Sequence, residues 1–423
     1  MISLLRLICA SFAANPFLGR NLYVNPTYVA NIQSSISTTT DPKTLANLNV
    51  AKFASSAYWL DNMAKVVPGS RGLNTAEGIL FDAAKQNPAP LVTFIVYDVP
   101  LRDCAAGASN GEIQCTDSDC AAGINMYKQH YIDPLVSILK KYTNVPVVLI
   151  IEPDSLPNLV TNLGMPKCAM AANSYKTCIT YAVNAFATLP NVQQYLDAAH
   201  GGWLGWATNA QPFSALVGSL GILPQLRGFA TNVANYQPLG QMCSAVGWCL
   251  PGAGHSSDLC CADPCSITTQ WNGANNEMNY IQLLGSLFPG KYFVTDTGRN
   301  GVPDSRSSCA NWCNAKGSGY GLLPTANTGN TLVDAFLWIK TPGESDGCAP
   351  ASNTCLRYDS MCSSADSLLP APEAGRWFDT QIHMLAKNAN FGKDGPSPTP
   401  SPTPSPTPTP SLGYWRCSQC SKH

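Results

Sequence analysis

The stretch VPVVLIIEPD, residues 145–154, is an apolar run followed by two carboxylates. It indicates the fold more directly than any other segment of the sequence. Longer segments separate it from comparable runs, and some of these, such as 124–142, are helical in character. Strands that alternate with helices predict a parallel sheet, and strands that are apolar throughout are buried on both faces. The comparable runs are 91–100, 192–200, 226–235, 291–298 and 331–340.

Polar side chains end most of these runs: Asp98, Asp154, Asp197 with His200, Asn235, Asp296 and Lys340. The carboxyl ends of parallel barrel strands meet at one mouth, where barrel enzymes place their chemistry. A single aspartate in such a position often caps the following helix instead. Caps alone explain a whole series of polar strand ends less well, so we expect a site at this edge of an α/β fold.

Composition narrows the class of partner. The chain has 423 residues, a formal net charge of −1 and only 12% charged residues, against roughly 25% in average proteins. Such a balance does not suggest a nucleic acid or an anionic membrane. A neutral polymer would suit this surface, although any secreted protein rich in small polar residues could share it.

The 18 cysteines indicate an oxidising compartment, since none forms a metal-ligand pattern with the scattered histidines. Clusters such as Cys260, Cys261 and Cys265 are typical of loops held by disulfides, with a zinc site as the less favoured alternative.

Four segments follow from the sequence pattern. Residues 1–14 resemble a short signal peptide, truncated or with a misassigned start. Residues 15–392 form one expected catalytic domain. A Pro/Ser/Thr linker at 393–411 is too proline-rich to pack and acts as an extended spacer. Residues 412–423 are a short tail, either a remnant of a carbohydrate-binding module or a remnant of cloning or of the gene model.

Asp154 directly follows the apolar run and Glu152–Pro153, which places its carboxyl group where the strand end partly encloses it. Enclosure raises a carboxyl pKa because it disfavours the charged form, and a second carboxylate nearby raises it further. An acid that stays protonated near neutral pH can protonate a leaving oxygen. We therefore expect Asp154 to be a general acid, with Glu152 as the competing candidate.

Two loops carry further acidic candidates. Asp103 lies in YDVPLRDCAAGASNGE, where glycines allow movement and Cys104 can pin the loop. Asp346 lies in WIKTPGESDGC, within seven residues of Lys340 and close to Glu344. Each candidate has a plain alternative. The RDC triplet around Asp103 is weak evidence by itself, and the charged loop around Asp346 is more often a solvated surface.

Several tryptophans lie among glycine, asparagine or aspartate rather than among aliphatic residues, which is unusual for core tryptophans. Flat aromatic faces with polar neighbours are what pyranose rings stack on. Trp338 lies inside TLVDAFLWIK and is assigned to the core instead. The candidate sugar-stacking residues are Trp59, Trp203, Trp206 and Trp312.

Together these segments resemble glycoside hydrolase family 6. The resemblance runs from NPFLGRNLYVNP to LAKNANF and rests on long motifs in the same order, among them YWLDN, IEPDSLPNLVTNL, YLDAAHGGWLGW, RGFATNVANY, TDTGRNG and LWIKTPGESDG. It implies a distorted α/β barrel that hydrolyses β-1,4-glucan with inversion and whose loops form an active-site tunnel.

The resemblance implies roles for the residues that match family positions. Asp154 matches the general acid, Asp103 the aspartate that keeps this acid protonated and organises water, and Asp346 the proposed base. Tyr97 and Ser109 match residues that line the cleavage point. Sugar-binding positions match Trp59, Asp61, His200, Trp203, Asn235, Trp312, Lys340 and Glu344.

The chain departs from fungal members of the family at Leu101, where they usually have an acidic residue, and at Ser345, where they have cysteine. Neither position is catalytic. With Cys9 excluded the cysteine count is odd, so one thiol is expected to be free or intermolecular. The resemblance implies two disulfides, Cys104–Cys168 and Cys313–Cys362.

Loop length favours an exo mode. Family members that act from chain ends roof the cleft with two loops, and the second is present here as residues 348–377. The resemblance therefore implies a secreted, extracellular cellobiohydrolase that releases cellobiose from non-reducing ends. The alternatives are an endoglucanase of the same family and, more remotely, a non-catalytic cellulose-binding protein, against which the intact aspartates argue. We expect a monomer that binds cellulose and cello-oligosaccharides, with no cofactor, metal, nucleic acid or membrane partner.

Overall fold

The computed structural model describes residues 14–392. The expected linker and C-terminal tail, and all but the last residue of the expected signal peptide, lie outside the described residues. No helix of the described part is long and apolar enough to span a bilayer.

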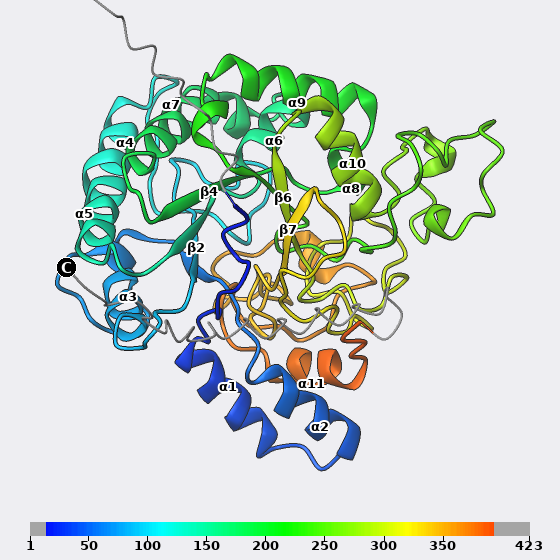
Figure 1. The fold of residues 1–423 in the computed structure, drawn as a ribbon, viewed down its shortest axis with the longest axis horizontal. Helices are drawn as coiled ribbons and strands as arrows, with labels where there is room; N and C mark the ends of the chain where they lie inside the picture. Colours follow the sequence, from blue (N-terminus) through cyan, green and yellow to red (C-terminus); the bar gives the residue numbers. More distant parts are fainter. Residues whose placement is uncertain (1–13, 393–423) are drawn as a thin grey trace, which may run out of the picture.

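Seven parallel strands form one curled sheet in which each strand pairs with the next along the chain. The amide of Ala57, just before the first strand, donates a hydrogen bond of 2.9 Å to the carbonyl of Trp338, just after the last strand. The expected distorted α/β barrel is therefore confirmed (Figure 1). The strands are β1 Tyr58–Leu60, β2 Val92–Val96, β3 Val147–Ile151, β4 Val192–Asp197, β5 Gly228–Thr231, β6 Tyr292–Asp296 and β7 Val333–Leu337.

Each apolar run of the sequence contains one of strands β2–β7. β1 was not predicted, because three residues are too few to show an alternating or apolar pattern. Within the long strands, successive side chains face opposite layers. In β3, Val148 and Ile150 point into the barrel interior, whereas Leu149 and Ile151 pack against the surrounding helices. This double burial explains why the run is apolar at every position.

Helices surround the sheet, and three of them, α1, α2 and α11, pack together as a separate layer beneath it (Figure 1). Trp338 lies in this layer, 1% exposed, so its assignment to the core is confirmed. The predicted helical segment 124–142 is α4 and α5 joined by a π-helical stretch, Tyr127–Ile132. The α-helices are α1 Pro26–Ile36, α2 Pro42–Ala51, α3 Ala76–Ala83, α4 Ala121–Met126, α5 Asp133–Lys141, α6 Ser155–Thr161, α7 Pro166–Phe186, α8 Gly201–Leu204, α9 Ala207–Ser219, α10 Glu277–Leu287 and α11 Asp379–Lys387.

The loops after the strands hold an unusual number of non-glycine residues in the left-handed region. Such conformations cost about 1–3 kcal/mol each and persist only where the surrounding structure enforces them. They concentrate at the carboxyl edge of the sheet, which is the edge that the polar strand ends indicated. Examples, with φ between 46° and 65°, are Asp103, Glu152, Asp154, Ala199 and Asn232.

Candidate active site

A cavity of about 620 Å³ opens at the carboxyl edge of the sheet. It brings together side chains from the loops after β1, β2, β3 and β7, which lie far apart in the sequence. Most of the predicted site residues line it: Trp59, Asp61, Tyr97, Asp103, Ser109, Asp154, Lys340, Glu344 and Asp346.

Asp154 ends the loop after β3 and directly precedes α6, yet its side chain makes no capping hydrogen bond to that helix. The plain alternative of a helix cap is therefore wrong. Burial raises the pKa of the Asp154 carboxyl well above its ordinary value, and the negative charges of Asp103 and Asp197 raise it further. Asp154 can thus keep its proton at neutral pH and present it to the cavity.

Asp103 lies on the loop after β2 and accepts a hydrogen bond from the hydroxyl of Tyr97. Burial raises the pKa of Asp103, while hydrogen bonds from Ser109 and Tyr97 favour its charged form. Lys167 donates to the backbone carbonyl of Asp103, 3.0 Å away, and adds a nearby positive charge. These contacts favour the anion at Asp103 over the anion at Asp154, which has no such donors.

Asp197, the last residue of β4, was not predicted as a site residue. Its Oδ2 accepts the backbone amides of Asp154, at 2.9 Å, and of Ala199, at 3.1 Å. Burial is the main cause that raises the pKa of Asp197 to about 7. The polar end of β4 was the available signal, but only the tertiary structure shows that Asp197 holds the backbone of Asp154 in place.

Glu152, the competing acid, points away from the cavity and into the protein. It is 1% exposed and accepts hydrogen bonds from the amides of Asp98 and Val99 and, at 2.8 Å, from the hydroxyl of Tyr127. Burial raises its pKa to about 7. Glu152 therefore ties β2 to β3 and cannot reach a substrate in the cavity.

Asp346 is held by three donors. Arg299 contacts both carboxylate oxygens at 2.8 Å, while the hydroxyl of Tyr236 and the amide of Asn314 bind Oδ2 at 2.7 and 2.8 Å. Oδ1 accepts only from Arg299 and keeps a lone pair for a water molecule. The side chain is therefore a fixed negative charge at the cavity wall, not a solvated surface group.

An aromatic and charged wall completes the cavity. Trp59 packs edge-on against Tyr97, and the ammonium group of Lys340 lies 5.5 Å from the Trp59 ring centre. Burial alone would raise the pKa of Asp61, but the ion pair with Lys65 at 2.7 Å and the nearby charge of Arg102 together lower it. Burial raises the pKa of Glu344. The wall offers one exposed ring face and several fixed hydrogen-bonding groups.

The other predicted sugar-binding residues do not line this cavity. The ring centre of His200 is 6.2 Å from that of Trp203, and burial lowers the pKa of His200 to about 3, so its imidazole is neutral. Trp203 donates to Thr161 at 2.9 Å. Asn235 accepts from Arg306 at 3.0 Å, and Trp312 is half-buried beside Cys313.

Two loops that contribute residues to the cavity wall contact each other. The amide of Gly107, on the loop after β2, donates to the Asp359 carboxylate at 2.7 Å. Ala108 is fully buried against Cys362, and a Cβ atom at Gly107 would lie 2.8 Å from the carbonyl oxygen of Tyr358. Only glycine permits so close an approach of the two backbones. Residues from the second loop, including Arg357, line the cavity.

Disulfides hold these loops. Cys104 pairs with Cys168 and Cys313 with Cys362, the two pairings that the resemblance implied. Within the described residues Cys178 is buried and unpaired. Cys265 pairs with Cys309, while the neighbouring sulfurs of the cluster lie close enough to hold a metal ion but form two disulfides instead, Cys243–Cys260 and Cys249–Cys261.

A barrel that presents a buried, protonated aspartate beside a charged one, next to a tryptophan face, has the arrangement of a glycoside hydrolase. Comparison with known sequences agrees with this class. The profile of glycosyl hydrolases family 6 matches residues 17–247 and 257–389, and the chain belongs to that family.

Named relatives are fungal enzymes. The chain is 43% identical to 1,4-beta-D-glucan cellobiohydrolase C of Emericella nidulans, over 90% of this chain and 80% of that protein. It is 40% identical to exoglucanase 2 of Hypocrea jecorina, over 90% and 76% of the two chains. The structure of cellobiohydrolase II from Humicola insolens in complex with glucose and cellotetraose is 37% identical, with a TM-score of 0.76, and covers 89% of this chain and 99% of that one.

Proposed function

We propose that this family 6 enzyme is a secreted, inverting cellobiohydrolase that releases cellobiose from the non-reducing ends of cellulose chains. The observation that carries the proposal is the buried Asp154 carboxyl beside Asp103 in a cavity roofed by two joined loops. The Humicola relative, whose fold this chain shares, binds cellotetraose. We extend that substrate class to this protein.

In the proposed reaction Asp154 protonates the glycosidic oxygen as the bond breaks. Asp103, charged and hydrogen-bonded to Tyr97 and Ser109, keeps the proton on Asp154 and organises water. A single displacement by water inverts the anomeric carbon, and inverting enzymes separate acid and base by roughly 6.5–9.5 Å to leave room for that water. We assign Asp346 as the candidate base, acting on water through the free lone pair of Oδ1.

Binding is assigned to the wall of the cavity and to its approaches. Trp59 offers a ring face to a pyranose, and Asp61, Lys340 and Glu344 offer partners for sugar hydroxyls. The further stacking and binding positions, away from the cavity, are His200, Trp203, Asn235 and Trp312.

The exo mode is inferred from the roof. A polymer cannot enter a closed tunnel sideways, so the joined loops favour threading from a chain end over internal cleavage. An endoglucanase would require the two loops to part, which the Gly107–Asp359 hydrogen bond opposes, while the Cys313–Cys362 bridge fastens the second loop to the segment after β6. A non-catalytic cellulose-binding protein would have no use for the raised pKa of Asp154.

Secretion is inferred from the disulfides. The described residues contain seven, and such bonds persist in oxidising compartments. We propose that the chain acts extracellularly as a monomer, with the proline-rich segment as a spacer to the tail.

Cellotetraose hydrolysis followed by proton NMR tests the reaction, and viscosity loss of carboxymethylcellulose tests the mode. We expect cellobiose with the α-anomer formed first, and slow thinning relative to bonds cut. A first-formed β-anomer would overturn the inverting mechanism. Rapid thinning would replace the exo assignment with the endo one, and no hydrolysis at all would leave only a binding protein.

A further inference from the structure

A disulfide-rich projection stands out from the barrel body at the end of the sheet that carries α8 and α10 (Figure 1). We call residues 241–272 the knob. The family profile matches up to residue 247 and resumes at 257, so residues 248–256 within the knob lie outside the family pattern. None of the groups assigned to the reaction belongs to the knob.

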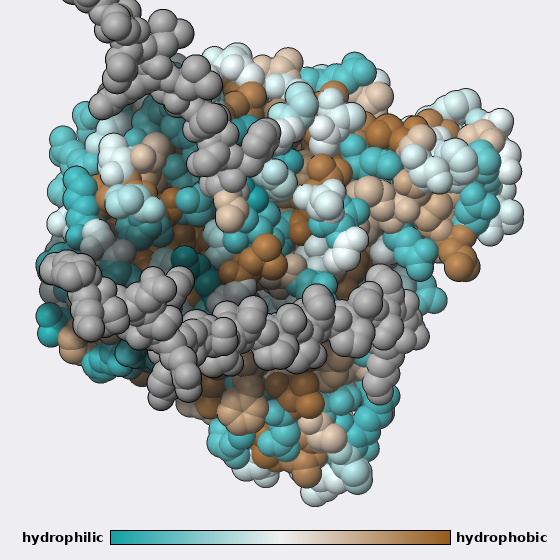
Figure 2. Space-filling model, in the orientation of Figure 1, coloured by the Kyte–Doolittle hydropathy of each residue, from teal (hydrophilic) through white to brown (hydrophobic). Residues whose placement is uncertain are grey.

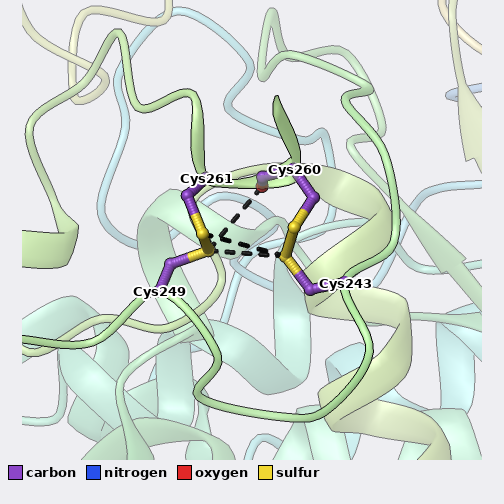
Figure 3. A group of neighbouring side chains, drawn as sticks. All are labelled: Cys243, Cys249, Cys260 and Cys261. Atoms are coloured by element: carbon purple, nitrogen blue, oxygen red, sulfur yellow. Dashed lines mark hydrogen bonds between the residues drawn. A yellow bond between two sulfur atoms is a disulfide. The ribbon is translucent and has the colours of Figure 1, made fainter. Parts of the chain in front are cut away.

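Sulfur holds the knob together in place of a hydrocarbon core. Cys243–Cys260 and Cys249–Cys261 lie side by side, with the Sγ atoms of Cys243 and Cys249 only 3.4 Å apart (Figure 3). The Asn279 side chain on α10 accepts the amide of Cys243 at 2.8 Å and anchors this pair to the body. A segment fixed in this way loses little conformational freedom when it binds a ligand.

Apolar side chains of the knob face outward. Trp271 is 66% exposed, Leu259 82% and Val246 48%. Trp248 lies flat against His255, with ring centres 3.6 Å apart. Figure 2 shows brown and pale atoms over much of this projection.

The knob also lacks positive charge, since residues 241–272 contain no lysine or arginine. Its two aspartates are engaged internally: Asp258 accepts the indole N–H of Trp248 at 2.8 Å, and Asp263 accepts the amide and hydroxyl of Thr268 at 2.7 Å. A largely apolar surface whose only charged side chains are two hydrogen-bonded aspartates does not suit nucleic acid or acidic lipid, both of which are anionic. It does suit the faces of neutral sugar rings, which present C–H groups.

The knob is joined to the segment that carries the two outer tryptophans. The indole N–H of Trp206 donates to the carbonyl of Gln270 at 2.9 Å, and the Asn272 side chain donates to the carbonyl of Gly201 at 2.8 Å. Trp271 lies between these two anchors in the sequence. Both neighbours of the exposed Trp271 are therefore hydrogen-bonded to the segment that carries Trp203 and Trp206.

We propose that the knob is an additional cellulose-binding platform, with Trp271 as its main contact, which holds the barrel on a glucan surface. The proposal rests on the proposed function for its ligand class. One large rigid aromatic ring often supplies most of the binding free energy at such a contact, with smaller apolar neighbours excluding water. Leu259 and Val246 would be the smaller apolar neighbours that exclude water around Trp271.

The test compares the full chain with Trp271→Ala, Trp271→Tyr and Phe53→Ala. Phe53, 69% exposed, lies just after α2 in the layer beneath the barrel and is the matched control. Depletion from solution by microcrystalline cellulose at 4 °C gives the partition constant. Turnover of soluble cellotetraose gives the activity of the catalytic cavity.

We expect Trp271→Ala to lower the partition constant by about tenfold, Trp271→Tyr to retain most of it, and Phe53→Ala to leave it unchanged. Turnover of cellotetraose should be equal in all four proteins. Wild-type partition of Trp271→Ala, or an equal loss in Phe53→Ala, would overturn the platform. Failure of the wild-type chain to cleave cellotetraose would instead overturn the proposed function. The partition data would still decide whether the knob binds cellulose.

Discussion

Asp154 and Glu152 show how much depends on the direction of a single side chain. They stand two residues apart after the same strand, and burial raises the pKa of both. Glu152 receives donors from Tyr127 and the backbone, whereas Asp154 receives none and lines the cavity. Geometry, and not pKa alone, therefore favours Asp154 over Glu152 as the proposed general acid.

Asp154→Asn should lower the turnover of cellotetraose by about 10²–10⁴-fold, because general acid catalysis contributes that much. Its affinity for cellotetraose, measured by calorimetry, should stay close to wild type, because the amide has the same shape. Glu152→Gln is the control, for which we expect reduced stability with turnover largely kept. Near-normal turnover in Asp154→Asn would remove the acid role from this residue.

Asp197 permits a test of the charge coupling. Its negative charge raises the pKa of Asp154, so Asp197→Asn should let Asp154 lose its proton at a lower pH. The alkaline limb of the kcat/KM profile should then shift toward acid, while the amide oxygen still accepts the Asp154 N–H. Asp296→Asn, at the end of β6, is the control and should leave that limb in place. An unchanged limb in Asp197→Asn would show that the two carboxyls are not coupled.

At the scale of elements, two loops from opposite ends of the chain form the roof. The loop after β2 supplies Gly107 and Ala108, and the loop after β7 supplies Asp359 and Cys362. One hydrogen bond to a carboxylate and a small apolar contact join them. In the proposed exo mode, this contact would favour threading of a chain end over sideways entry.

Asp359→Ala should loosen the roof, because the Gly107 amide loses its partner and the loop of residues 348–377 loses a tie to the other side. We expect faster viscosity loss of carboxymethylcellulose per reducing end formed, with cellotetraose turnover little changed. Asp304→Ala, at an exposed position on the segment after β6, serves as the control. Identical viscosity curves for the two variants would mean that the bond does not govern entry.

At the scale of the whole molecule, several carboxyl groups are buried in the folded protein although burial disfavours their charged form. Burial raises the pKa of Glu152, Asp197 and Glu277 to about 7 each. Their unfolded values are near 4, so the folded protein binds these protons more tightly than the unfolded chain does. The stabilisation is complete below about pH 4 and is lost as the pH rises toward 7.

We therefore expect a higher Tm at pH 5 than at pH 7.5 in scanning calorimetry. His200 has the opposite effect on stability. Because its pKa is lowered in the folded protein, it reduces the free energy of unfolding as the pH falls below the pKa of the unfolded chain. This contribution of one imidazole is set against those of several carboxyl groups. Glu277→Gln should narrow the difference in Tm, and Asp304→Asn should not. A Tm that rises from pH 5 to pH 7.5 would contradict this balance.

The sequence by itself determined the sheet and its functional edge. Apolar runs such as 145–151 predict buried parallel strands because double burial leaves no place for polar side chains, and polar strand ends mark the mouth. The three-residue strand β1 escaped this reasoning because its pattern is too short to read. The family motifs added the site residues that the local pattern could not rank, among them Asp103 and Asp346.

Only the tertiary structure decided which acid faces the cavity and what holds it there. Glu152 and Asp154 have similar local sequence, and the left-handed backbone between strand and helix turns one inward and the other toward the cavity. Asp197 and Arg299 act through partners 43 and 47 residues away. The pairing of the knob's cysteines and the meeting of Gly107 with Asp359 likewise depend on contacts between distant segments, and no local periodicity records such contacts.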